Sequence, residues 1–131
     1  MSNLTLKATD WASLAKLAKN GETKKLGYNT TVENVDGTMF IRHHDNIIAA
    51  LSPDGSFTIS NAGWGSVTTR DRLNRILRSN GVRFGITQKN FVQVLFQHGT
   101  DDRWENFESA EFNTDGQLTR FNGIGLGISV G

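Results

Sequence analysis

The stretch NAGWGSVTTRDRLNRILRSNG, residues 61–81, determines the expected fold class because its hydrophobic spacing changes from strand-like to helical. Thr68 is a predicted N-cap with Asp71 three residues later, and Asn80-Gly81 ends a predicted helix over residues 68–79. One arc of this helix is apolar and the opposite, solvent-facing arc is basic. The apolar arc holds Thr69, Leu73, Ile76 and Leu77, and the basic arc holds Arg72, Arg75 and Arg78.

Short strands are predicted on both sides of this helix. Alternating apolar residues predict strands at 28–35, 38–44, 46–51 and 56–60 before it, and at 82–86, 92–96, 104–112 and 117–121 after it. Turns such as Asp36-Gly37, Asp45-Asn46 and Pro53-Asp54-Gly55 are too short for the crossover that parallel strands need. We therefore expect a twisted antiparallel sheet, arranged as a meander.

These elements predict a single α+β domain over residues 1–131, with the helix of 68–79 packed across one face of the sheet. Thr9-Asp10-Trp11 opens a short N-terminal helix, capped by Thr9 or Asp10 and ended by Asn20-Gly21. Residues 1–25 form this helix and a lead-in, and residues 26–131 form the β-rich core. The residues expected to be buried together are Leu73, Ile76, Leu77, Ile41, Ile47, Phe84 and Ile86.

The charge of the chain is divided into two opposed blocks. The 131 residues carry a net charge of +1, yet residues 70–89 hold six basic residues against Asp71, and residues 101–115 hold six acidic residues against Arg103. Such blocks mark binding surfaces or self-association, or they neutralise each other across the fold. The chain has no cysteine, no secretory signal and no apolar run of about 18 residues, so we expect a cytoplasmic protein with no membrane partner.

The loop before the predicted helix and the helix itself combine groups that bind anions. Free N–H groups at a helix start, hydroxyl groups and guanidinium groups suit a phosphate, and Trp64 suits a stacked base. The candidate partner-binding residues are Trp64, Thr68, Thr69, Arg70, Arg72, Arg75 and Arg78. The alternative is purely structural, with Trp64 filling the core beneath its loop and Thr68 acting only as a cap.

Catalytic patterns are weak in this sequence. His43, His44 and Asp45 are consecutive, but neighbouring strand residues point to opposite faces, and no HExxH or cysteine–histidine spacing completes a metal site. No GxSxG sequence provides a nucleophile, and the glycines at 123, 125 and 127 precede no helix that would hold a dinucleotide. We therefore expect a non-catalytic protein without cofactor or metal.

The string LSPDGSFTISNAGWGSVTTRDRLN, Leu51 to Asn74, resembles a pattern of small bacteriophage proteins. Their shared pattern is a DG turn, a GW step, and two threonines followed by a basic residue and an Arg/Lys-hydrophobic-Asn ending; the resemblance spans residues 26–78. Asn61-Ala62-Gly63 departs from the two glycines that such proteins often carry there. The resemblance implies a phage protein in the host bacterial cytoplasm. Phage proteins of this size are frequently counter-defence factors, such as anti-CRISPR proteins and the Thoeris anti-defence proteins that sequester signalling nucleotides.

The expected function is capture of a phosphate-bearing partner, a nucleotide signal or a nucleoprotein, by a phage-type counter-defence protein that inhibits a host immune system. The alternatives are an anti-CRISPR protein that contacts a Cas effector purely through protein, a small nucleic-acid-binding protein, and, ranked last, a metal-dependent hydrolase using His43 and Asp45. The glycine-faced stretch of residues 123–130 resembles an unprotected edge strand, so we also expect a homo-oligomer.

Overall fold

A computed structural model describes residues 9–63, 66–90, 92–123 and 126–129, which fold into two antiparallel sheets and two helices. The helices are α1 (Trp11–Leu17) and α2 (Val67–Ser79). The strands are β1 (Thr23–Gly27), β2 (Thr30–Val35), β3 (Thr38–His43), β4 (Asn46–Leu51), β5 (Phe57–Ser60), β6 (Phe84–Lys89), β7 (Val92–Gln97), β8 (Arg103–Glu105), β9 (Phe107–Phe112), β10 (Leu118–Gly123) and β11 (Leu126–Ser129). The predicted α+β class is confirmed.

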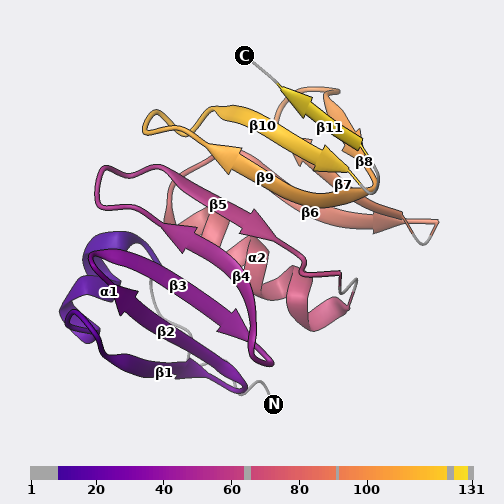
Figure 1. Ribbon diagram of the computed structural model, residues 1–131. Coiled ribbons are helices and arrows are strands. Elements are labelled where there is room, and N and C mark those ends of the chain that lie inside the picture. Colours follow the sequence, from indigo (N-terminus) through magenta and orange to yellow (C-terminus); the bar gives the residue numbers. More distant parts are fainter. Residues whose placement is uncertain (1–8, 64–65, 91, 124–125, 130–131) are drawn as a thin grey trace.

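The larger sheet has eight strands in the order β1-β2-β3-β4-β5-β9-β10-β11 (Figure 1). Strands β2 to β5 form the predicted meander, β1 extends it at one edge, and β9 pairs antiparallel with β5 at the other. The turn between β3 and β4 is His44-Asp45, one residue earlier than expected, because His43 pairs with Asn46. Both turn residues have positive φ angles, 52° and 67°, which is the geometry of a tight type I′ hairpin.

The expectation of one sheet is wrong. Between β5 and β9 the chain leaves the large sheet, forms α2, and builds a separate three-stranded sheet in the order β6-β7-β8. The strand predicted over 104–112 is broken at Asn106, whose φ of 58° interrupts the extended backbone, so β8 pairs with β7 and β9 returns to the large sheet. β1 is an additional strand that the sequence pattern did not indicate.

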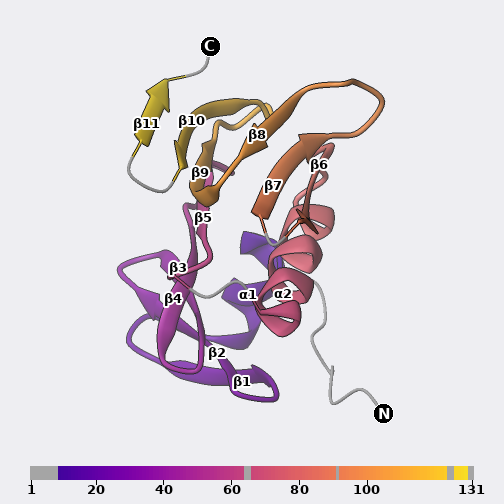
Figure 2. The same cartoon turned by 90° about the vertical axis from the view of Figure 1, so that its right-hand side faces the viewer.

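Both helices lie on the same side of the large sheet (Figure 2), and the hydrophobic core fills the space between the helices and the sheet. Leu73, Ile76 and Leu77 of α2 are buried as predicted. They join the expected strand residues Ile41, Phe84 and Ile86. Ile47 is instead 41% exposed, because a bulge opposite Ile41 and Arg42 turns Ile48 and Ala49 toward the core.

The short helix α1 is anchored at both ends. Asp10 is its N-cap and accepts a hydrogen bond from the Ser13 N–H. Of the two caps predicted, Thr9 and Asp10, the structure has Asp10. The indole Nε1 of Trp11 donates to the Gly37 carbonyl at 2.6 Å, which ties the helix to the β2–β3 turn. The backbone carbonyl of Ala18 accepts from the buried Asn34 side chain at 3.0 Å.

Arg72 is the main departure from the predicted solvent-facing arc, since only 2% of the residue is exposed. Its Nε donates to the Thr30 hydroxyl at 3.0 Å, and its Nη2 donates to the Tyr28 carbonyl at 3.2 Å. Its Nη1 also lies 3.2 Å from the Asp71 carboxylate. Burying a guanidinium charge is costly unless its donors are paired, and these contacts pair them with β2, with the β1–β2 turn and with α2 itself.

The terminal strand β11 pairs antiparallel with β10, so one of its edges is covered within the chain. The side chains of Ile124, Leu126, Ile128 and Val130, which entered the edge-strand argument, lie outside what the structure describes. Homo-oligomer formation stays a prediction.

The first prediction concerns Arg72. Replacing it in Arg72→Met keeps an unbranched apolar stem but removes the hydrogen bonds that Arg72 donates to Thr30 and Tyr28, so the free energy of unfolding should fall by about 3 kcal/mol. The matched substitution at exposed Arg78, Arg78→Met, should change it by less than about 0.5 kcal/mol. Urea denaturation followed by circular dichroism measures both. Equal, small effects of the two substitutions would show that Arg72 does not anchor α2.

Candidate functional site

The N-terminus of α2 begins one residue earlier than expected, and its cap is Ser66 rather than Thr68. Ser66 has an extended backbone, and its Oγ accepts a hydrogen bond from the Thr69 N–H at 3.1 Å. The Ser66 carbonyl accepts from the Arg70 N–H. The backbone N–H groups of Val67 and Thr68 have no hydrogen-bond partner among the described residues, so the positive end of the helix dipole retains free donors.

A cavity of about 430 Å³ lies at this helix N-terminus, between α2 and the β3–β4 end of the large sheet. Its lining combines the ends of β3, β4 and β5 with the first turn of α2. The lining residues are His43, His44, Asn46, Ile48, Asn61, Ser66, Thr68 and Thr69. No carboxylate is among these residues, so nothing in the lining opposes an anion.

His43 is the buried polar group of this cavity, with 3% of the residue exposed. It pairs with Thr30 across the β2–β3 ladder, and its Nδ1 lies 3.1 Å from the Thr30 hydroxyl. Its other ring nitrogen, Nε2, is buried and has no hydrogen-bond partner. Burial lowers the pKa of His43 below its ordinary value of 6.5, and electrostatic interaction with His44 and Arg72 lowers this pKa further, against a smaller opposing effect of the Asn29 backbone.

The other polar groups of the lining differ in how much of their hydrogen-bonding capacity is used. Asn61 is bonded at both amide atoms, because its Nδ2 donates to the Phe107 carbonyl at 2.7 Å and its Oδ1 accepts from the Gly63 N–H. Ser66 and Thr69 are bonded to each other. Thr68 is exposed, and its hydroxyl has no partner among the described residues. The Thr68 hydroxyl and the buried Nε2 of His43 therefore have no partner, and the His44 ring and Asn46 Oδ1 also line the cavity without a hydrogen bond among the described residues.

The predicted site residues separate into two groups. Thr68 and Thr69 line the cavity, and Arg72 lies behind it, joined to His43 through Thr30. The remaining arginines do not converge on it. Arg70 donates to Gln88 at 2.7 Å, Arg75 lies 3.1 Å from Asp71, and Arg78 is exposed in the last turn of α2. Trp64 lies outside the described residues.

Sequence reasoning missed Asn61, Ser66 and the binding potential of His43. The signal for His43 was present: it follows Ile41 at strand spacing, so it shares the core-facing side of β3 with a fully buried residue. His44 and Asp45 are exposed in the turn. Among the described residues no group of three or more histidines and carboxylates lies close enough together to hold a metal ion.

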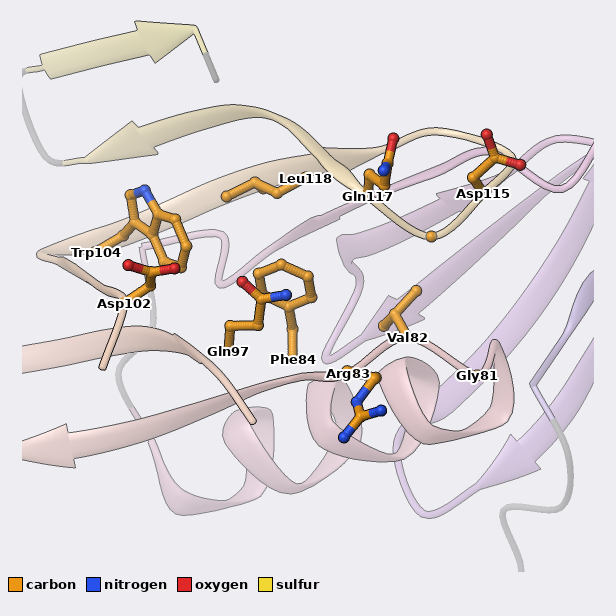
Figure 3. A pocket seen from close by; sticks show the side chains of 11 residues that line it. Gly81, Val82, Arg83, Phe84, Gln97, Asp102, Trp104, Asp115, Gln117 and Leu118 are labelled. Carbon is orange, nitrogen blue, oxygen red and sulfur yellow. The ribbon is translucent and has the colours of Figure 1, made fainter. Parts of the chain in front are cut away.

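A second cavity, of about 560 Å³, lies where the two sheets meet (Figure 3). Val82, Phe84 and Leu118 provide buried apolar surface, while the carboxylate-bearing Asp102 and Asp115 stand at opposite ends. This cavity also contains Arg83, but its two carboxylates disfavour a phosphate. The acidic residues of 101–115 are all exposed. The cavity at α2 is thus the better candidate for an anion.

A family model described as "Kyanoviridae Gp96 protein" matches residues 10–120 of the chain. This range includes the complete helix α2 and every residue that lines the cavity at its N-terminus. No curated protein and no solved structure matches the chain. No helix among the described residues has both the length and the apolar character needed to cross a membrane.

The second prediction tests the assignment of the cap. Ser66→Ala removes the acceptor for the Thr69 N–H and should lower the free energy of unfolding by about 1 kcal/mol. Thr68→Ala should change it by less than about 0.5 kcal/mol, since Thr68 is exposed and does not cap the helix. Thermal or urea denaturation compares the two variants. The opposite order of effects would restore Thr68 as the cap.

The third prediction follows from the lowered pKa of His43. The unfolded chain binds a proton near the ordinary value of 6.5, whereas the folded chain resists it, so folding stability falls as pH drops below 6.5 toward the folded-state pKa. The slope from this one group is at most about 1.4 kcal/mol per pH unit. His43→Gln removes this contribution, and His98→Gln, at an exposed histidine, should retain it. Urea titrations from about pH 5 to about pH 8 test this, and identical profiles for the wild type and His43→Gln contradict it.

Proposed function

Because this chain belongs to the Kyanoviridae Gp96 protein family, a family of phage proteins, we propose that it is a non-catalytic binding protein that captures a phosphate-bearing partner. The cavity at the N-terminus of α2 is the proposed binding site. The proposed place of action is the cytoplasm of the host cell.

The observation that carries this proposal is the set of donors that face a cavity without carboxylates. Thr68 lines this cavity, and neither its N–H group nor its hydroxyl has a partner among the described residues. The N–H group of the preceding Val67 also has no partner there. Oxygen atoms of phosphate groups accept hydrogen bonds from such groups, and the helix dipole favours their negative charge. The buried His43 adds a polar group on the opposite wall.

The dimensions of the cavity favour a small ligand over nucleic acid. A volume of about 430 Å³ is within the range of about 300–1,000 Å³ typical of small-molecule sites. Binding along a nucleic-acid backbone needs a row of available cations, but Arg72 is buried and Arg75 is paired with Asp71. The proposal therefore commits to a nucleotide-sized ligand.

A nucleotide signal of host immunity is the ligand that best joins this site to a phage protein. A phage protein that holds such a signal without converting it lowers the free concentration available to host receptors. Counter-defence by sequestration is thus the proposed biological role, and direct contact with a Cas effector is an outcome that the experiment below distinguishes.

The fourth prediction uses a charge placed at the cavity rim. Thr68→Asp adds a carboxylate in the first turn of α2, where the helix dipole tolerates it, but it repels a phosphate in the cavity. At about 4 Å the repulsion weakens ATP binding at least tenfold. The matched control Thr114→Asp places the same charge in the exposed β9–β10 turn and should leave the affinity unchanged.

Calorimetric titration with ATP measures this affinity, and mass spectrometry identifies nucleotides that heating releases from protein purified out of phage-infected cells. ATP binding that Thr68→Asp weakens, or a released nucleotide that this variant lacks, supports the proposal. If ATP does not bind and no nucleotide is released on heating, the proposal is contradicted. Co-purification of a Cas effector without any released nucleotide would replace it with the protein-contact alternative.

A further inference from the structure

Thr30 is the residue through which the fold sets the protonation of His43. Its hydroxyl oxygen lies 2.9 Å from the Tyr28 carbonyl oxygen, 3.0 Å from Arg72 Nε and 3.1 Å from His43 Nδ1. Two oxygen atoms approach to 2.9 Å favourably only if one donates a hydrogen, and a carbonyl cannot donate. The single hydroxyl hydrogen of Thr30 is therefore directed to Tyr28.

The remaining contacts of Thr30 then have only one solution. Arg72 Nε is always a donor, so it uses one lone pair of the Thr30 oxygen. Nδ1 of His43 must donate to the other lone pair, because Thr30 has no second hydrogen to give. In the neutral ring the proton accordingly sits on Nδ1, and Nε2 keeps a bare lone pair that is buried in the wall of the cavity.

A bare, buried lone pair is costly, and it is also wrong for an anion. Nε2 is buried without a hydrogen-bond partner, which lowers the stability of the folded protein because this atom has lost its hydrogen bond to water. An incoming phosphate oxygen would meet this lone pair with repulsion. Protonation of Nε2 converts it to a donor, and the anion then offsets the burial of the imidazolium charge.

We infer that His43 takes up one proton at Nε2 when a phosphate dianion enters the cavity, so that ligand capture and protonation of this histidine are coupled. The proton comes from solvent, or from the phosphate itself when a P–OH group is present. The inference rests on the proposed function, since it concerns the ligand of the same cavity. It favours a terminal, doubly charged phosphate over a singly charged diester, because the attraction to the imidazolium is larger.

The charged groups around His43 agree with this direction of coupling. From α2, Arg72 faces it across Thr30, with Asp71 paired to the outer side of that guanidinium. The β3–β4 turn contributes His44, whose ring centroid lies 4.3 Å from that of His43, and the exposed Asp45. β2 and β4 contribute the uncharged Thr30 and Asn46. Arg72 is thus the permanent charge that faces His43 most directly, and an anion in the cavity would offset its repulsion of a protonated ring.

The fifth prediction isolates the titration of the protein by using sulfate, a tetrahedral dianion whose own charge is constant over the pH range. In the interval between the pKa of His43 in the free protein and its higher pKa in the complex, sulfate affinity should fall about tenfold for each unit of rising pH. Nuclear magnetic resonance of the His43 ring should show its pKa raised by at least one unit at saturating sulfate, the equivalent of about a tenfold gain in affinity. Dimethyl phosphate, a singly charged diester, should bind more weakly than sulfate and raise this pKa less.

The variant His43→Gln should bind sulfate with an affinity that no longer depends on pH, while the control His98→Gln should keep the wild-type slope. The ring titration of the wild-type protein tests the inference even if His43→Gln fails to fold. One result would overturn this inference and leave the proposed function standing. In it, sulfate binds the wild-type protein without changing the pKa of His43, and Thr68→Asp abolishes this binding. Failure of sulfate, inorganic phosphate and ATP to bind at any pH would overturn both.

Discussion

The buried guanidinium of Arg72 is the interaction on which the candidate site depends. A charge that is 2% exposed requires nearby acceptors, and Arg72 obtains them from the Thr30 hydroxyl at the start of β2 and the Tyr28 carbonyl in the β1–β2 turn. These contacts hold the first half of α2 against the β2–β3 end of the large sheet. They also occupy one lone pair of Thr30, and through Thr30 they fix the ring of His43 beside the helix N-terminus. One buried cation thereby positions both the helix donors and the histidine.

The sequence predicted the helix and its apolar arc well, because Leu73, Ile76 and Leu77 repeat at helical spacing and no competing pattern interrupts them. It misplaced Arg72 because a helical wheel assumes one buried face. In the fold, α2 contacts β4 of the large sheet and β6 of the small one, so it is covered over more than one arc. The second sheet could not be predicted either, since the alternation of apolar residues identifies strands but not their partners. The break at Asn106, which separates β8 from β9, is also not marked by a glycine or proline.

The candidate site was predictable in part. Thr68 and Thr69 were singled out from the helix start, and both line the cavity. His43 was considered as a metal ligand or one half of an acid–base pair, and an ordinary strand-end histidine was favoured. A histidine on a strand does not indicate what lies opposite, and its partner Thr30 is set by the register of β2 against β3. The bulge that exposes Ile47 and buries Ile48 shows the same limit, since one extra residue reverses which side chains face the core.

The central claim is that the cavity between α2 and the β3–β4 turn binds a phosphate group through the helix N-terminus and His43. A crystal structure of the protein grown with inorganic phosphate tests it most directly. The account predicts a phosphate ion in this cavity, with oxygen atoms within about 3 Å of His43 Nε2 and of the Thr68 backbone nitrogen. Phosphate bound only on the exposed Arg78 surface, or in the cavity but away from His43, would contradict it.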